Sequence, residues 1–364
     1  MHGKILLRQS SSQLTSATQC IIIIQDFIAF ILSRESISVN HWKKDLLFDM
    51  TKWISFLGKI LILAIIFSIF TGCAVVSQSP DEDTVQFTDA LGRQVSIPKK
   101  PRRVAALLGS FADIWVLAGG ELCAAAEDAW TDFGLELPGA VNIGGAHSPN
   151  LELLFSSDPE LVIASASTAS NVQLKDTLEA AGIPVAYFDV DHFYDYLAML
   201  DTLTDITGRK DLYAQNGLAL QTQIEDIKAH TDLPEERRTV LLLRVHSGSV
   251  KAKGSEGTVL GEMLADLGCR NIADSDLSLL ENLSVESILL QEPYRIFVVT
   301  MGNDTEKALK NLENMILENP AWNSLSAIRE GRIYLMDRKL FNMKPNADWA
   351  ESYEQLSNIL LAEE

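Results

Sequence analysis

Two segments of the chain, 134 residues apart, carry the same local pattern. Each has a residue suited to cap a helix, a glutamate two places later, a carboxylate followed by proline, and then an apolar run. These residues are Asn150, Glu152, Asp158 and Pro159 in the first copy, and Ser284, Glu286, Glu292 and Pro293 in the second. The pattern predicts a short helix, a stop before the proline and a buried strand. A chain that repeats this unit is expected to form two similar lobes.

Strand-like apolar runs alternate with helical stretches in both halves of the chain. The runs cover residues 103–108, 161–164 and 184–188 in the first half, and 239–243, 296–299 and 332–335 in the second. Such alternation predicts βαβ units and parallel sheets. A hairpin over residues 87–98, with its turn at Asp89 to Gly92, precedes the first run.

A helical stretch of nearly 40 residues, broken only at Thr207 and Gly208, separates the two halves. We therefore predict an α/β fold with two Rossmann-like lobes joined by one long α-helix, and any closure of the lobes should be small. The expected boundaries are residues 85–193 for the N-terminal lobe, 194–231 for the bridging helical segment and 232–364 for the C-terminal lobe. The second lobe carries extra residues between Arg244 and Thr258.

The segment 50–72 has the features of a bacterial lipoprotein signal peptide. Lys52 and Lys59 precede an apolar run, and the run ends just before Cys73. This end resembles a lipobox, although Phe70 stands where leucine is usual. The expected product carries a diacylated Cys73 and lies outside the cytoplasm, on the outer face of the cell membrane. A single membrane-spanning anchor is the alternative, since the apolar character extends to Val76.

The residues around this segment have simpler interpretations. Residues 1–49 contain an apolar run that Asp26 interrupts, and they precede a signal that normally begins at the initiator. We expect Met50 to be the true start and the first 49 residues to be a mis-called upstream extension. Residues 73–84 contain Ser77, Gln78, Ser79, Pro80 and three acids and are expected to form a flexible tether.

The net charge of the chain limits the kinds of molecule that it can bind. The formal net charge is −19, and the first 72 residues hold more basic than acidic residues, so the rest is still more acidic. Nucleic acid is therefore excluded as a partner, and we expect a monomer.

Only Cys123 and Cys269 belong to the folded part, and their spacing is not that of a metal or redox motif. Free thiols are expected, with pairing between the lobes left open.

Together, these features resemble the substrate-binding lipoproteins of ABC importers for ferric siderophores, haem and cobalamin. The resemblance covers residues from about 73 to 364. It is carried by the lipobox-like end, the two repeated segments, the hairpin at residues 87–93, Pro101 to Val104, Thr207 to Arg209, and Gly257 to Gly261 leading to Asn271. It implies the class III periplasmic-binding-protein fold, in which one long helix joins the lobes.

The resemblance also implies a docking role for the two repeated glutamates. In this family one glutamate on each lobe binds arginines of the membrane permease, and the matching positions here are Glu152 and Glu286. The alternative is that both carboxylates only complement a helix N-terminus, which contributes about 0.3–1 kcal/mol each. The two roles are compatible.

Candidate ligand-binding residues follow the predicted strands, because open α/β sheets bind ligands at the carboxyl ends of their strands. In the first lobe these are Ser110, Trp130, His147 and residues 165–170. Trp130 is the strongest candidate there, since an aromatic ring can cover a flat ligand. Its alternative role is local packing.

In the second lobe the candidates are mostly cationic. They are Arg244, His246, Lys251, Lys253, Met301, Arg338, Phe341 and Lys344. So many bases near one cleft of an acidic protein favour an anionic ligand, such as a ferric complex with carboxylate or catecholate groups. Each base alone could instead be a solvated surface residue, with Arg244 at a strand end the exception. The histidines show no metal-site spacing, so no metal site and no resident cofactor are expected.

The predicted function is capture of an iron complex, a ferric siderophore, and its delivery to an ABC permease. Cobalamin or haem is the alternative ligand. A ligand sensor or a surface hydrolase on the same fold is the alternative from another class. No enzymatic motif occurs, and residues 254–257 are expected to lack the strand-turn-helix context of a phosphate-binding loop.

Overall fold

The computed structural model describes residues 83–302 and 304–362, and residues 79–364 form one compact unit. The predictions for the upstream extension, the signal peptide, Cys73 and most of the tether lie outside the described residues. Within the described ranges, no helix has both the length and the apolar character needed to cross a bilayer. The buried cores described below lie within this unit, so it can be produced by itself for the experiments that follow.

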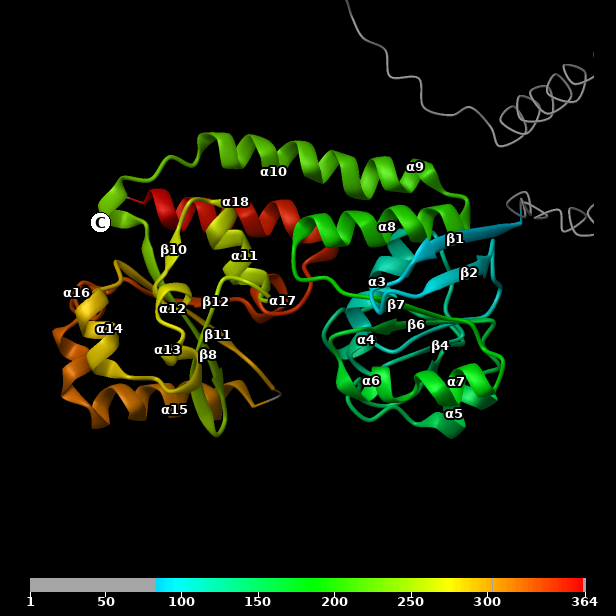
Figure 1. Cartoon of the computed structure of the whole chain (residues 1–364), viewed down its shortest axis with the longest axis horizontal. Helices are drawn as coiled ribbons and strands as arrows, with labels where there is room; N and C mark the ends of the chain where they lie inside the picture. Colours follow the sequence, from blue (N-terminus) through cyan, green and yellow to red (C-terminus); the bar gives the residue numbers. More distant parts are fainter. Residues whose placement is uncertain (1–82, 303, 363–364) are drawn as a thin grey trace, which may run out of the picture. The chain divides into compact units, whose positions relative to one another are not determined.

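The first lobe is a five-stranded parallel sheet with helices on both faces (Figure 1). Its strand order is β5-β4-β3-β6-β7. The strands are β3 (Val104–Ala106), β4 (Ala124–Ala125), β5 (Val141–Asn142), β6 (Leu161–Ser165) and β7 (Val185–Phe188). All residues of β3, β4, β6 and β7 are buried, as expected for strands covered on both faces. The strand order reverses between β3 and β6.

Local sequence signals account for most of this lobe. The hairpin β1 (Thr84–Thr88) and β2 (Gln94–Pro98) forms as predicted, and Oδ1 of Asp89 accepts hydrogen bonds from N–H of Leu91 and Arg93 in its turn. Helix α3 (Gly109–Leu117) begins at Gly109, so Ser110 lies inside its first turn. Two short helices, α6 (Ala169–Gln173) and α7 (Lys175–Ala180), connect β6 to β7.

The second lobe has a mixed sheet in the order β10-β8-β11-β12, with β9 also paired to β8. The strands are β8 (Thr239–His246), β9 (Ser249–Lys253), β10 (Arg270–Asn271), β11 (Arg295–Thr300) and β12 (Ile333–Met336). The extra residues of this lobe form β9, an antiparallel partner of β8 that follows a two-residue turn at Ser247 and Gly248. The candidate residues Lys251 and Lys253 therefore lie on a strand.

The repeated segments form the same structure in both lobes. In helix α5 (Leu151–Ser156), Oδ1 of Asn150 accepts a hydrogen bond from Leu153 N–H at 3.1 Å. In helix α14 (Val285–Gln291), Oγ of Ser284 accepts one from Ser287 N–H at 3.3 Å. The residues before the prolines have φ values of 47° at Asp158 and 43° at Glu292, in the left-handed region. The predicted cap and stop are confirmed in both copies.

The predicted bridging segment is two helices that lie side by side. Helix α8 (Phe193–Thr207) ends at Gly208, whose φ is 74°. The chain then turns back through α9 (Lys210–Tyr213), the π-helical turn η1 (Ala214–Leu218) and α10 (Ala219–His230). Figure 1 shows α9 along α8 and α10 along α18 (Trp349–Leu361). Only the stretch from α9 to α10 crosses between the lobes, and α8 belongs with the first.

One buried cluster contains side chains of both lobes. It includes Phe111 and Phe193 from the first lobe, Leu242 and Phe297 from the second, and Trp349 of α18. Each sheet also has a buried cluster of its own on its other face. A continuous apolar core under the bridging helix limits the movement of one lobe against the other, because separation would expose it to water.

The remaining helices are short, apart from α15. They are α4 (Asp128–Thr131), η2 (Glu235–Arg237), α11 (Val259–Asp266), α12 (Ile272–Ser275), α13 (Ser278–Glu281), α15 (Thr305–Glu318), η3 (Pro320–Ser324), α16 (Ser326–Arg329), α17 (Arg338–Phe341) and η4 (Asn346–Asp348). Helices α4 and α17 follow strands β4 and β12 and lead to the site described next.

Candidate functional site

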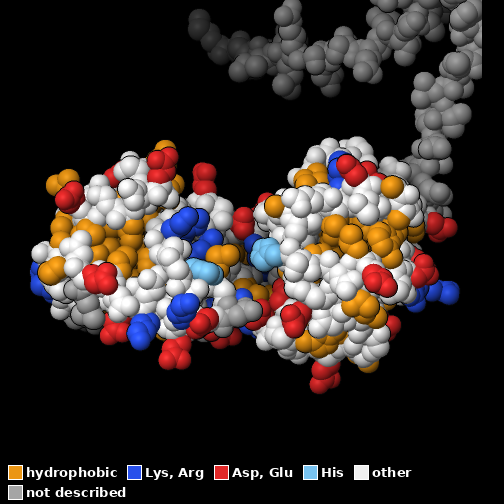
Figure 2. Space-filling view, turned by 90° about the horizontal axis from the view of Figure 1, so that it is seen from below, with side chains coloured by type: hydrophobic (Ala, Val, Ile, Leu, Met, Phe, Trp, Pro, Cys, Tyr) orange, Lys and Arg blue, Asp and Glu red, His pale blue; other side chains and the backbone are white. Residues whose placement is uncertain are grey.

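The segments that follow the carboxyl ends of the strands in one lobe contact those of the other. Ion pairs join Asp132, after β4, to Arg338, after β12, and Asp191, after β7, to Lys344. Figure 2 shows a hollow between the lobes, with Lys, Arg and His side chains gathered on the second lobe beside it. This is the edge at which open α/β sheets bind ligands.

Arg338 and Asp132 form a two-point ion pair across this junction. Nη1 of Arg338 lies 3.2 Å from Oδ1 of Asp132, and Nη2 lies 3.5 Å from Oδ2. The side chains are 28% and 24% exposed. Nε of Arg338 is buried and has no hydrogen-bond partner among the residues that the structure describes. Arg338, predicted as a ligand contact, is thus at the junction, but its charge is already balanced.

Lys344 has a similar partner. Its Nζ donates to Oδ1 of Asp191 at 2.9 Å, and the side chains are 16% and 29% exposed. Asp191 follows β7 and precedes α8, so the first lobe supplies the anion and the second lobe the cation in both pairs. A ligand that binds either base must first displace a carboxylate.

Arg244 differs from these two bases. It lies in β8, opposite Lys251 of β9 and Val299 of β11. Its side chain is half-buried, and among the described residues it has no ion pair and no hydrogen-bond partner, with Nε fully buried. Burial lowers the pKa of Arg244, and the attraction of Asp191 opposes that shift. A desolvated guanidinium without a partner is costly and fits a site that receives an anion.

Three other predicted residues are open to a ligand. His246 is exposed at the end of β8, and its ring lies beside Gly302, where an added Cβ would be 3.1 Å from Nε2. Met301 follows β11 and is 43% exposed. His147 is exposed after β5 in the first lobe. These side chains are of types that can ligate a haem iron.

The other three predicted contacts are partly or wholly buried. Ser110 is 4% exposed, and its carbonyl oxygen accepts a hydrogen bond from Nδ2 of Asn346 at 2.9 Å. Phe341 is 2% exposed in the core that the lobes share. Trp130 is half-buried and packs against the same core. Ser110 and Phe341 therefore have no side-chain surface to offer a ligand in this structure, and Trp130 has only part of its ring.

Sequence reasoning missed the acids of this junction. Besides Asp132 and Asp191, Asp128 accepts a hydrogen bond from Gly109 N–H at 2.9 Å, and burial raises its pKa. Asp113 accepts one from Nδ2 of Asn346 at 2.8 Å, and burial raises its pKa as well. The position of Asp191 three residues after the strand predicted over 184–188 was an available signal, whereas Asp113 lies within α3 and its contact comes from a residue 233 positions away.

The two repeated glutamates lie on the surface. Glu152 and Glu286 are exposed and occupy the second position of α5 and of α14. Neither carboxylate has an ion-pair or hydrogen-bond partner in the part of the chain that the structure describes. Both are therefore available to a cationic partner.

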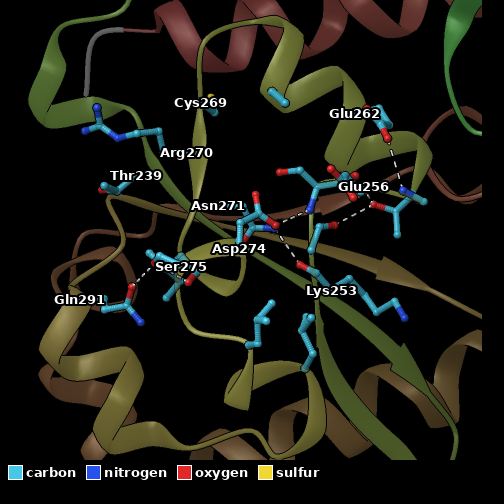
Figure 3. A pocket seen from close by; sticks show the side chains of 18 residues that line it. Thr239, Lys253, Glu256, Glu262, Cys269, Arg270, Asn271, Asp274, Ser275 and Gln291 are labelled. Atoms are coloured by element: carbon cyan, nitrogen blue, oxygen red, sulfur yellow. Dashed lines mark hydrogen bonds between the residues drawn. The ribbon is translucent and has the colours of Figure 1, made fainter.

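A separate pocket of about 1190 Å³ lies at the edge of the second sheet, between β9, β10 and α13 (Figure 3). Hydrogen bonds between backbone N–H groups and carboxylates join the segments that line it. Oδ1 of Asp274 accepts from Ser255 N–H at 2.8 Å, and Oε1 of Glu262 accepts from Gly257 N–H at 3.3 Å. Residues 254–258 do stand between a strand, β9, and a helix, α11, which corrects the expectation about their context. With N–H groups facing carboxylates, the turn is unsuited to phosphate.

Side chains of the metal-binding types do not form a cluster in the part of the chain that the structure describes. Among residues 83–302 and 304–362, no group of three or more His, Cys, Asp or Glu side chains is placed to hold a metal ion. Cys123 is half-buried and Cys269 is buried, and both are free thiols. This answers the question of pairing between the lobes, because no disulfide joins these two cysteines.

Sequence and structure comparisons place the chain among known proteins. The Fe(3+)-citrate-binding protein YfmC of Bacillus subtilis is 25% identical over 300 residues, which cover 76% of this chain and 90% of that protein. SirA of Staphylococcus aureus, solved with staphyloferrin B, has 20% identity and a TM-score of 0.57, covering 76% of this chain and 97% of that one.

A third similarity concerns another ligand class. IsdE of S. aureus, solved with heme, has 15% identity and a TM-score of 0.59, covering 71% of this chain and 99% of that one. Both solved structures have the bilobed fold found here. The model of the family described as "Periplasmic binding protein" matches residues 104–340, which is more than half of the chain and includes both sheets. The chain belongs to the periplasmic binding protein family.

Proposed function

We propose that this protein is an extracytoplasmic solute-binding protein of an ABC importer, anchored by lipid at Cys73. It captures an anionic iron complex, a ferric siderophore or similar chelate, and delivers it to the permease. The observation that carries the proposal is Arg244, a half-buried guanidinium near the carboxyl end of β8 that has no partner among the described residues. Arg338 and Lys344 at the same junction extend the cationic surface.

The relatives support this class of ligand. YfmC is named for ferric citrate, and SirA was solved with staphyloferrin B. By analogy, the second lobe of this chain supplies the bases that hold the ligand, with Arg244 as the first contact. The exposed part of the Trp130 ring supplies an additional contact surface for the ligand. The protein performs no covalent chemistry, and capture followed by docking is its mechanism.

Haem is the second candidate ligand. Exposed Met301, His246 and His147 favour it, since thioether and imidazole groups bind haem iron. Against it stand Arg244, Arg338 and Lys344, because three bases at one junction suit a chelate with several anionic groups better. Cobalamin has no specific observation in its favour.

Docking rests on Glu152 and Glu286. Each carboxylate is exposed, lacks a partner among the described residues and lies in the same position of its repeat. Two matched anionic points are suited to two arginine-bearing permease subunits, because carboxylate and guanidinium form strong two-point pairs.

A titration tests the ligand assignment. Residues 79–364 are titrated with ferric citrate, ferric catecholate and ferric hydroxamate complexes, haem and cobalamin, and tryptophan fluorescence is followed. Saturable quenching by one class of iron chelate, lost in Arg244→Ala and kept in Arg102→Ala, is expected. Arg102 is an exposed arginine that precedes the amino end of β3, whereas the ligand site is expected at the carboxyl ends of the strands. Quenching by haem alone would transfer the assignment to haem, and no quenching would remove the iron assignment.

Uptake in cells tests the docking assignment. The double variant Glu152→Ala/Glu286→Ala should bind its ligand normally and fail to support uptake. The exposed pair Glu236 and Glu354, also changed to alanine, is the matched control. Unimpaired uptake in the first variant would favour a ligand sensor, and turnover of ester or phosphate substrates by the pure protein would favour a hydrolase.

A further inference from the structure

The cations at the lobe junction are not equivalent. Arg338 and Lys344 of the second lobe are each held by a carboxylate of the first lobe, whereas Arg244 has no partner within residues 83–302 and 304–362. Both pairs are less than one third exposed, so bulk water and salt screen them less than surface pairs.

A ligand with one anionic group gains little from such a junction. To bind Arg338 or Lys344 it must replace a carboxylate that the fold already holds in place. One carboxylate then replaces another, while the ligand loses its freedom of translation and rotation. Arg244 alone offers a single unshared contact.

A ligand that carries several anionic groups on one frame is in a different position. Its first group binds Arg244, and the entropy of association is then already lost. The remaining groups act at high effective concentration and compete with Asp132 and Asp191 for their bases. Asp191 also attracts Arg244, so its displacement affects two of the three bases.

We propose that Asp132 and Asp191 are specificity-determining residues: as built-in competitors for Arg338 and Lys344, they restrict the junction to ligands that present several anionic groups together. This inference rests on the proposed function, since it concerns the same ligand site. It adds the residues that exclude small single-charged anions such as acetate.

The chain offers close controls for both acids. Glu136 lies four residues after Asp132, and Asp189 lies two residues before Asp191. Both are exposed and have no ion-pair or hydrogen-bond partner among the described residues. Glu136→Gln and Asp189→Asn therefore remove the same charge from the same segments without releasing a base.

The test uses iron-free citrate and acetate as probes in calorimetric titrations at low salt, on residues 79–364. Asp132→Asn and Asp191→Asn should each tighten citrate binding by about tenfold. The double variant should also bind acetate measurably, unlike the wild type. Glu136→Gln and Asp189→Asn should resemble the wild type.

Three results would overturn the inference. They are citrate affinities equal to those of the control variants, weaker citrate binding in the Asn variants, and no citrate binding even in the double variant. The melting temperatures of all variants are compared so that a folding defect is recognised. If a ferric chelate binds the wild type and both Asn variants equally, the proposed function stands and this inference fails. If no iron complex binds, the proposed function fails and the iron-free titration still decides this inference.

Discussion

Nε2 of His192 lies 3.2 Å from Oδ2 of Asp266, which connects the residue before α8 with the end of α11 in the other lobe. The same carboxylate oxygen accepts a hydrogen bond from Oη of Tyr353 at 2.8 Å and lies 3.2 Å from Nζ of Lys228. Burial favours a raised pKa for Asp266, but the bonds from His192 and Tyr353 and the Lys228 charge lower it to about 2. The hydrogen bond to Asp266 raises the pKa of His192.

These shifts predict a pH window for the stability of the connection. The pKa of His192 is raised from 6.5, so its contribution is complete below pH 6.5 and is lost as pH rises through the folded value. The pKa of Asp266 is lowered from 3.8, so its contribution is complete above pH 3.8 and is lost toward pH 2. The network should therefore contribute most between about pH 4 and 6.5.

Urea unfolding of residues 79–364 from pH 3 to 9 tests this window. His192→Gln should lower the free energy of unfolding by about 1.5–3 kcal/mol at pH 5.5, and by less at pH 8.5. His230→Gln, which changes an exposed histidine, should leave the pH profile as it is. A difference between wild type and His192→Gln that stays constant from pH 5.5 to 8.5 would contradict the charged pair.

Arg244→Met should make the protein more stable and unable to bind its ligand. Methionine is of similar length and needs no hydrogen-bond partner, whereas the guanidinium is half-buried and has no partner in the part of the chain that the structure describes. We expect the free energy of unfolding to rise by about 1 kcal/mol. Chemical denaturation measures it, with Arg102→Met as the exposed control. A loss of stability would mean that Arg244 has a structural role.

Gly208→Ala should destabilise the turn between α8 and α9. Gly208 has a φ of 74°, and an added Cβ would lie 3.2 Å from Cε of Lys100. The cost should be about 1 kcal/mol in the free energy of unfolding. Gly145→Ala is the control, because φ there is not in the left-handed region and the nearest atom to a new Cβ is 3.8 Å away. Equal stability of the two variants would contradict the role assigned to Gly208.

Thiol labelling should distinguish the two free cysteines. Cys269 is 7% exposed, and burial raises its pKa to about 12, so its thiolate is scarce at neutral pH. Cys123 is half-buried, and burial raises its pKa too. In residues 79–364, Ellman's reagent should react slowly with Cys123 alone, and with both thiols in urea. A Cys123→Ser variant should show no native reaction, and rapid reaction of that variant would contradict the burial of Cys269.

Signals that act within a few residues were sufficient to predict the repeated units. Asn150 and Ser284 cap their helices, and Asp158 and Glu292 stop the chain before proline, because each effect needs only neighbouring backbone groups. The hairpin turn at Ser247 and Gly248 is equally local, and its Ser-Gly pair is a turn signal. The strand after it was harder to predict, because Ser249–Lys253 contains two lysines and lacks an apolar run.

The site was less predictable, because it depends on contacts between distant segments. Arg338 and Asp132 are 206 residues apart, and the sequence around either residue contains no local signal that predicts the pair. The same holds for Phe341, which follows a strand end as a ligand contact would but turns into the shared core. A residue that follows a strand can be assigned to the region between the lobes from the sequence alone. The direction in which its side chain points depends on contacts with the opposite lobe.

The π-helical turn η1 (Ala214–Leu218) gives the bridging helix an unusual property. A π turn contains one residue more than the α-helical turn it replaces, and each residue of an α-helix rotates the following side chains by about 100°. The wide turn takes up this extra residue, so that α9 can stay against α8 while α10 stays against α18. Deleting a single residue within η1 should therefore restore an α-helical turn and leave both contacts in place, whereas deleting one residue from α10 would rotate every following side chain by about 100°. The π turn is thus a point at which the bridging helix tolerates a change of length without misaligning the two lobes.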